Sequence, residues 1–451
     1  MDRIRSLFAS RVHYEPIENE GDVDVDGVGV PEEDEGEAVP PRTFSWLEYS
    51  IFLLLGIAML WAWNMFMAAA PYFHNRFQSR EWAVKSYQPS ILSVSTITNL
   101  ACVLVLAKRQ GNAPYPRRII LSLVITMITF SLLALSTIFL RDVAVGVYFF
   151  FLIVMVFSAS FATGISLNAV FAYVSGFGCP QYTQALMVGQ AVAGVLPCTI
   201  QILSVLAIPA QKGGATNLTQ RESSNSAFVY FIMSTGVSVL TLIAFLYHLK
   251  NPSLATQKLS QESSGMGLHP HRKNVGLWNL FKKLHWLALS SVVCFAVTMA
   301  FPVFTVEIES VHDPANRPAL LEPAAFVSLA FLVWNTGDLI GRLSSLIPGF
   351  SLVRYPLGLF IFSVLRLIFI PLYLLCNVHG RGAVIHSDFF YLAVVQLLFG
   401  ITNGYIGSCS VISATQLVPA EEREAAGGFM GMTLVAGLSV GSLLSFFIAV
   451  A

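Results

Sequence analysis

Long apolar blocks separated by short polar segments run from about residue 45 to the end of the chain. The blocks at 119–140, 143–175 and 182–210 contain no charged residue. A helix needs about 20 mostly apolar residues to cross the hydrocarbon core of a bilayer, so each block is long enough to span it. The whole pattern predicts eleven transmembrane helices, at residues 47–70, 86–107, 118–140, 145–174, 181–208, 226–249, 284–306, 323–347, 354–377, 388–413 and 425–450.

The polar segments divide the chain into four predicted regions. Residues 1–44 are acidic and rich in Gly and Pro, a composition that buries too little apolar surface to fold alone, and a disordered cytosolic tail is expected there. A polar stretch at 250–283, expected to be a cytosolic loop, separates six predicted helices in 45–249 from five in 284–451. The expected fold is therefore an all-α integral membrane protein with eleven transmembrane helices in a 6+5 arrangement.

Composition supports the same class of protein. Of the 451 residues, 55% are hydrophobic and 12% are charged, and the mean hydropathy is +0.67. Soluble domains carry about twice that charged fraction. The formal net charge is +0, so no overall field favours binding to nucleic acid. The six cysteines form no CxxC pair, and most lie within apolar blocks, where a free thiol behaves as a small hydrophobic group.

The distribution of Lys and Arg predicts the orientation, because the cytosolic loops of membrane proteins carry an excess of both. With the N-terminus in the cytosol, sixteen of the 26 Lys and Arg residues fall in cytosolic segments and eight on the opposite side. An odd number of helices then places the C-terminus on the side opposite the cytosol. Asn217 begins an Asn-Leu-Thr sequon on that non-cytosolic side, and we predict it as a glycosylation candidate.

The predicted eighth helix carries charged residues, which are costly near the middle of a membrane unless they are paired or hydrated. Asp338 and Arg342 are four residues apart and Asn335 is three before Asp338, so the three share one helix face. Phe331 lies one further turn along the same stripe. Two compatible interpretations are open: an ion pair that joins this helix to its neighbours, and a polar site that binds a hydroxyl-rich solute.

Amide side chains also lie in other predicted helices, among them Asn64 in the first, Asn168 in the fourth, Gln190 in the fifth and Asn403 in the tenth. Each of these alone more often joins two helices than contacts a ligand. Together, in different helices, they suggest a shared hydrated cavity. Arg366, in the ninth helix, is interpreted as a structural or snorkelling arginine rather than a solute ligand.

Motifs for other kinds of chemistry are missing from the sequence. It has no GxxxxGK[ST] phosphate loop, no HExxH, no GxSxG and no His/Cys metal cluster. We therefore expect neither an ATP-driven motor nor an enzyme, and we predict no cofactor. The energy source is expected to be the gradient of the solute or of an ion. The expected partners are the lipid bilayer and the solute, with no nucleic acid and no obligate protein partner.

Four segments are specific when they are taken together. They are WNMFMAAAPYF at 63–73, FPVFTVEIES at 301–310, WNTGDLIGR at 334–342, and the pair TNGY at 402–405 with PAEEREAAG at 419–427. Over most of the chain from about residue 47, these segments and the 6+5 division resemble the equilibrative nucleoside transporters. The acidic tail and short central loop resemble a fungal or other lower-eukaryote branch of that family. The resemblance implies a bundle similar to the major facilitator fold and facilitative transport of purine and pyrimidine nucleosides, with nucleobases as a further class, by alternating access.

The resemblance also implies a site. Asp338 and Arg342 would bind the ribose hydroxyls with Asn335 nearby, and a carboxylate that accepts beside a guanidinium that donates suits a vicinal diol. The implied pocket walls are apolar, aromatic or thioether-bearing, and they come from the first, eighth and last helices: Leu60, Trp63, Met67, Phe331 and Leu438. Asn168 stands where mammalian members often have a glutamine that hydrogen-bonds the base. Its amide is shorter, so the base preference is left open.

Alternatives to a facilitative nucleoside carrier stay open at the level of sequence. The first alternative is a carrier of the same architecture for another polar solute, such as a sugar. Proton-coupled nucleoside transport is the second alternative, with Asp338 or Glu307 as the titrating group, and a non-transporting membrane protein is the third. The plasma membrane and a vacuolar or lysosomal membrane are both compatible with the sequence.

Overall fold

The computed structural model describes residues 44–109, 113–207, 220–251, 275–313 and 317–450. Within these ranges the regular structure is helical, apart from one isolated antiparallel bridge between Ile308 and Val378. The predicted tail, Asn217 and most of the predicted central loop lie outside the described residues. The glycosylation candidate therefore stays a prediction.

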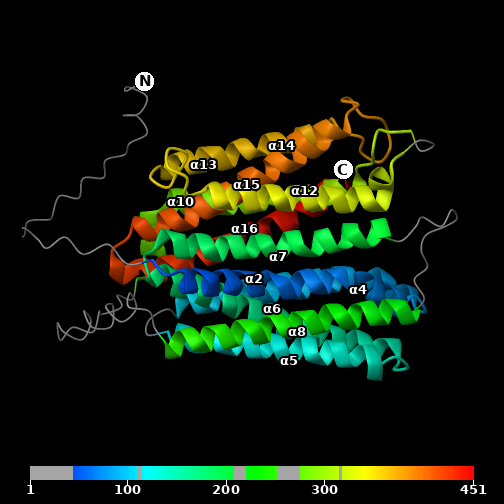
Figure 1. Cartoon of the computed structure of the whole chain (residues 1–451), viewed down its shortest axis with the longest axis horizontal. Coiled ribbons are helices and arrows are strands. Elements are labelled where there is room, and N and C mark those ends of the chain that lie inside the picture. Colours follow the sequence, from blue (N-terminus) through cyan, green and yellow to red (C-terminus); the bar gives the residue numbers. More distant parts are fainter. Residues whose placement is uncertain (1–43, 110–112, 208–219, 252–274, 314–316, 451) are drawn as a thin grey trace, which may run out of the picture.

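The helices form two groups that follow one another in the sequence (Figure 1). The first group comprises α2 (Trp46–Ala68), α3 (Ala70–Phe77), α4 (Glu81–Lys108), α5 (Tyr115–Phe139), α6 (Val145–Gly176), α7 (Pro180–Ala207) and α8 (Gln220–Lys250). The second group comprises α10 (Leu277–Thr298), α11 (Ala300–Glu307), η2 (Ala319–Leu321), α12 (Pro323–Ser344), α13 (Pro356–Leu365), η3 (Arg366–Ile368), α14 (Phe369–Leu374), the π-helix η4 (Phe390–Leu397), α15 (Leu398–Gln416), η5 (Ala420–Glu422) and α16 (Arg423–Val450).

The predicted class, an all-α integral membrane protein, is confirmed. In the described ranges, ten helical segments are long and apolar enough to cross a membrane. The predicted eighth span, α12, is not among the ten, and its second half carries the polar segment WNTGDLIGR. Its 22 residues correspond to about 33 Å at 1.5 Å per residue, which is about the thickness of the hydrocarbon core. The count of eleven spans stays a prediction.

The start of α10 differs from the predicted boundary. The predicted loop extends to residue 283, whereas the helix begins at Leu277. Its first two turns are amphipathic, with Leu280 and Leu284 buried and Trp278 exposed. The backbone leaves helical geometry at Leu284, with φ −117° and ψ 17°, so the apolar span that the sequence predicts follows a short kinked segment. This segment belongs to the polar stretch that predicts a loop, because it contains Lys282 and Lys283.

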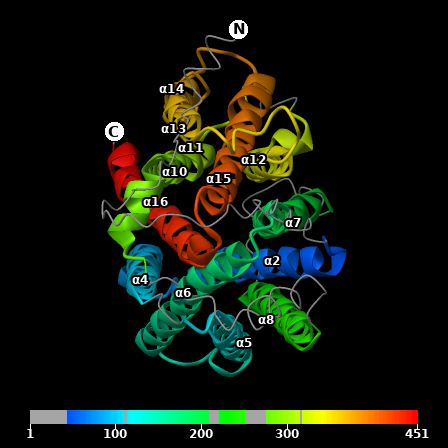
Figure 2. The same ribbon diagram turned by 90° about the vertical axis from the view of Figure 1, so that its left-hand side faces the viewer.

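The two groups of helices lie side by side when the bundle is seen from its end (Figure 2). They meet where α6 packs against α16 and where α7 packs against α12. Gly427 of α16 lies so close to α6 that a Cβ there would be 2.5 Å from the carbonyl oxygen of Phe171. Only glycine permits that approach. This interface brings residues far apart in the sequence to the centre of the molecule.

We call the end of the bundle at which α2 starts the proximal end. The start of α7 lies there too, because the backbone N–H of Ser45 donates to the hydroxyl of Tyr182 at 3.1 Å. The end of α12 joins them, where Gln184 Nε2 donates to the carbonyl of Leu343 at 2.9 Å. The two groups are therefore in hydrogen-bonded contact at the proximal end.

Candidate functional site

A cavity of about 390 Å³ lies between the two groups of helices. Its volume is within the range of small-molecule sites, about 300–1,000 Å³. Both groups contribute to its wall: α2, α4, α5, α6 and α7 from the first, and α10, α12, α15 and α16 from the second. On α2 the lining runs from Leu60 to Phe66, the half of that helix remote from the proximal end.

The polar stripe of α12 faces this cavity. Asn335, Asp338 and Arg342 all line it, and the exposed fractions of Asp338 and Arg342 are only 3% and 5%. Arg342 Nε donates to Asp338 Oδ2 at 2.7 Å, which is the i,i+4 ion pair that the spacing predicts. Burial makes such a pair strongly dependent on both partners, because a lone buried charge is costly.

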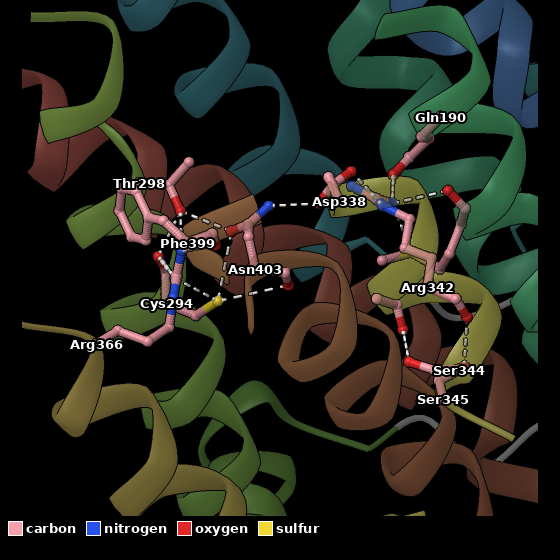
Figure 3. A network of polar contacts seen from close by, with 12 residues as sticks. Gln190, Cys294, Thr298, Asp338, Arg342, Ser344, Ser345, Arg366, Phe399 and Asn403 are labelled. Atoms are coloured by element: carbon pink, nitrogen blue, oxygen red, sulfur yellow. Dashed lines mark hydrogen bonds and ion pairs between the residues drawn. The ribbon is translucent and has the colours of Figure 1, made fainter. Parts of the chain in front are cut away.

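Arg342 also reaches across to the other group of helices (Figure 3). Its Nη1 donates to the carbonyl of Met187 at 2.8 Å and to Gln190 Oε1 at 3.0 Å, both on α7. The guanidinium therefore connects α12 to α7 through the wall of the cavity. The first interpretation of the stripe, an ion pair that joins this helix to its neighbours, describes this contact. Arg342 also lies in the wall of the cavity, and binding of a hydroxyl-rich solute there stays a prediction.

Asp338 is held from a second side by α15. Asn403 Nδ2 donates to Asp338 Oδ1 at 2.7 Å, so each carboxylate oxygen accepts one short hydrogen bond. This contact requires α12 and α15 to pack closely, and a Cβ at Gly404 would overlap the carbonyl of Asp338. A carboxylate has about four acceptor positions, so Asp338 keeps capacity for a further donor such as a ligand hydroxyl.

Six of the nine residues predicted for the site line the cavity. Besides the three on α12, these are Leu60 and Trp63 on α2 and Leu438 on α16. Asn335 donates to the carbonyl of Phe331 at 2.8 Å, and the Cβ of a residue at Gly194 of α7 would overlap its amide.

The other three predicted residues are not part of the lining. Met67 is 48% exposed and directly follows Phe66, the last lining residue of α2. Phe331 packs edge to face on Phe301, with 5.0 Å between ring centroids. Asn168 is fully buried and accepts a hydrogen bond from Arg118 Nη1 at 3.1 Å, so its carbonyl oxygen is directed to α5.

The other polar residues of the spans divide in the same way. Asn64, Gln190 and Asn403 line the cavity, as the prediction of a shared cavity requires, while Asn168 does not. Arg366 is 1% exposed and its Nη1 donates to a backbone carbonyl of α10 at 2.6 Å, so it is a structural arginine and does not snorkel.

The wall formed by the first group carries polar residues that the sequence did not single out. They are small and lie on α4, α5 and α6: Ser95, Thr96, Asn99, Thr126, Ser160 and Thr163. Asn99 Oδ1 and Ser160 Oγ are buried without a hydrogen-bond partner among the described residues. Hydroxyls in membrane helices commonly bond their own backbone, which hides them in a sequence. The i,i+4 pair Ser95 and Asn99 and the i,i+3 pair Ser160 and Thr163 are the signals that mark these faces.

Comparison with known proteins identifies the family of this chain. The sequence profile of the family described as Nucleoside transporter matches residues 152–272 and 248–450. Nucleoside transporter FUN26 of Saccharomyces cerevisiae is 30% identical over 443 residues, covering 89% of this chain and 83% of its own. Equilibrative nucleoside transporter 1 of Mus musculus is 28% identical, covering 88% of this chain and 95% of its own.

Among solved structures, the Major Facilitator Superfamily transporter FucP in the outward conformation is similar in fold. Its TM-score is 0.54 at 16% identity, with 90% of this chain and 92% of that chain covered. The predicted similarity to the major facilitator fold is thereby confirmed. The profile match over more than half of the chain, with the similarity to FUN26 over most of its length, shows that this multi-pass membrane protein belongs to the nucleoside transporter family.

Proposed function

We propose that this protein is a facilitative carrier of purine and pyrimidine nucleosides that works by alternating access. The observation that carries the proposal is the buried Asp338–Arg342 pair in the wall of a cavity between two groups of helices. Family membership supports the substrate class, since the relatives are named as nucleoside transporters.

The pair supplies both kinds of group that a vicinal diol needs. Asp338 accepts a hydroxyl hydrogen, and the Arg342 guanidinium donates to a hydroxyl oxygen. Asn335 lies one turn away on the same wall and offers an amide. The ribose end of the substrate therefore binds against α12, and the base extends toward the apolar and aromatic residues of α2 and α16, including Trp63 and Leu438.

The opposite wall is the place where the base would be read. Nucleobase edges present hydrogen-bond donors and acceptors. Asn99 Oδ1 and Ser160 Oγ are buried and have no hydrogen-bond partner among the described residues, so both are available to a base. Asn168 is directed away from the cavity toward Arg118, so it does not take the role that the resemblance implied. Short, neutral groups on this wall suit several bases, which fits a carrier of broad selectivity.

Alternating access requires the two groups of helices to separate at one end of the bundle while they close at the other. We take the helices of 45–249 and 284–451 as the two moving units. Their proximal ends are joined by Gln184 Nε2, which donates to the carbonyls of Arg342 and Leu343 at 3.2 and 2.9 Å. With the N-terminus in the cytosol, as the Lys and Arg distribution favours, the proximal end is cytosolic and this state is closed to the cytosol.

Reconstitution in liposomes tests the proposal. Purified protein is expected to take up labelled adenosine and uridine to equilibrium, with the same extent of uptake with and without a pH gradient. Arg342→Ala is expected to abolish this flux, whereas Lys85→Ala, at a surface position with a 76% exposed side chain, leaves it intact.

Three results would contradict the proposal. Uptake of both nucleosides no greater than in empty liposomes removes the function. Competition by glucose without competition by uridine indicates a sugar carrier. Accumulation above equilibrium that depends on a pH gradient indicates proton coupling.

A further inference from the structure

We propose that Arg366, Thr298 and Asn403 form a relay of hydrogen bonds that orients Asp338 for the ribose diol, although Arg366 itself does not reach the cavity. The inference rests on the proposed function and deepens it. It turns a buried arginine that looks purely structural into a positioning residue for the sugar half of the site.

The relay runs through four elements of the second group (Figure 3). Arg366 Nη2, in η3, donates to Thr298 Oγ1 of α10 at 3.2 Å. Thr298 Oγ1 donates to Asn403 Oδ1 of α15 at 2.6 Å. Asn403 Nδ2 donates to Asp338 Oδ1 of α12 at 2.7 Å. Each link therefore donates toward the carboxylate.

The direction of the relay fixes the amide of Asn403. Its oxygen faces a hydroxyl that donates, and its nitrogen faces a carboxylate that only accepts. The reversed amide would place an acceptor against the carboxylate of Asp338, which leaves two acceptors facing each other. Thr298 has one hydroxyl hydrogen and two acceptors within reach, Asn403 Oδ1 at 2.6 Å and the carbonyl of Cys294 at 2.8 Å. The shorter contact is the one to Asn403, and the carbonyl of Cys294 also accepts from Arg366 Nη1 at 2.6 Å.

Arg366 is anchored independently of the cavity. Its guanidinium lies 4.6 Å from the ring centroid of Phe399 and its Nη1 donates to the carbonyl of Cys294. The side chain is 1% exposed and is not part of the cavity lining. Burying a charged side chain in a membrane protein costs free energy, so such residues are normally paired and commonly have a function. Its fixed position gives the relay a rigid origin.

The relay also controls which way the carboxylate faces. Asp338 Oδ2 is held by Arg342 Nε and Oδ1 by Asn403, so the plane of the carboxylate is set from two helices. Loss of the Thr298 hydroxyl removes the shortest hydrogen bond to Asn403 Oδ1 and leaves only the longer contact from Cys294 Sγ at 3.6 Å. The amide of Asn403, and with it the second anchor of the carboxylate, is then held less firmly. Ligands that need the carboxylate for a 2′,3′-diol should suffer, and ligands without the diol should not.

The test compares uridine with 2′,3′-dideoxyuridine in the reconstituted full-length protein. The readout is the ratio between the KM for uridine uptake and the inhibition constant of the dideoxy compound. Thr298→Val removes the hydroxyl and is expected to raise the KM for uridine about threefold to tenfold, the loss of one hydrogen bond, with the other constant changed less than about twofold. Thr298→Ser keeps the hydroxyl and is expected to retain the wild-type ratio.

Arg366→Lys is the second variant, because its side chain does not line the cavity. Lysine keeps the charge but loses the planar fork that bonds Thr298 and Cys294 at once, so the ratio is expected to shift in the same direction. An unchanged ratio in Arg366→Lys, with a shift in Thr298→Val, overturns the relay, because Thr298 would then act by direct contact. Equal changes of both constants overturn it as well.

Failure of the relay and failure of the proposed function give different results. If the wild-type protein transports uridine and Arg342→Ala does not, while both relay variants keep the wild-type ratio, only the relay is refuted. If the wild-type protein transports neither nucleoside, the proposed function itself fails.

Discussion

Replacing one charge of the Asp338–Arg342 pair should lower the stability of the protein more than replacing both charges. In Asp338→Asn, one carboxylate oxygen becomes an amide nitrogen. Arg342 Nε and Asn403 Nδ2 both donate to this residue, so the new nitrogen faces one of these donors whichever way the amide is turned. One of the two hydrogen bonds is therefore lost. Arg342 is left as a buried cation, at 5% exposure, with neutral acceptors alone, among them Met187 O and Gln190 Oε1.

The expected size follows from these contacts. A hydrogen bond to a charged group contributes about 1.5–3 kcal/mol. Breaking a buried pair by removing one charge costs about 3–5 kcal/mol, because the second charge stays buried without its partner. Replacing both charges removes that penalty. The double variant Asp338→Asn, Arg342→Gln should therefore be more stable than the single variant Asp338→Asn.

The assay is the thermal melting of the detergent-purified protein, for the wild type, the two single variants and the double variant. Transport is expected to be lost in all three variants, so stability and not flux is the quantity that separates them. The control is Lys85→Ala with Glu81→Ala, which removes an exposed i,i+4 pair at 3.8 Å and should change melting little. Additive losses in the double variant would refute the reasoning, since they would show that the two charges do not depend on one another.

Three further predictions concern packing and selectivity. Gly189→Ala should lower the melting temperature through an overpacking cost of about 1–3 kcal/mol, because a Cβ there would overlap the α2 backbone, whereas Gly236→Ala, with nothing within 4 Å of its Cβ, should not. Ser160→Ala should change the ratio of adenosine to uridine uptake, while Asn168→Ala should leave it unchanged; the reverse pattern would return base recognition to Asn168. Met67→Ala should keep the wild-type KM for uridine within about twofold, because that side chain is not part of the cavity lining, and a larger change would contradict this placement.

Features that lie within one helix could be predicted from the sequence. The apolar blocks marked the membrane helices because a bilayer sets the length of a span. The spacing of Asp338 and Arg342 predicted their ion pair because residues four apart meet on one helix face. In the part of the chain that the structure describes, ten helices are long and apolar enough to span a membrane, and the ion pair is present. The family could be identified as well, since short motifs carry it.

Contacts between helices were decided only by the tertiary structure. The pairing of Asn403 with Asp338, the reach of Arg342 to α7 and the turn of Asn168 toward Arg118 depend on how each helix is rotated about its axis. In a soluble protein, an apolar stripe reveals that rotation. Membrane helices are apolar on the faces toward lipid and toward protein alike, so the sequence contains little signal for it. Close packing at glycines such as Gly404 sets the rotation instead, and that packing requires both partners.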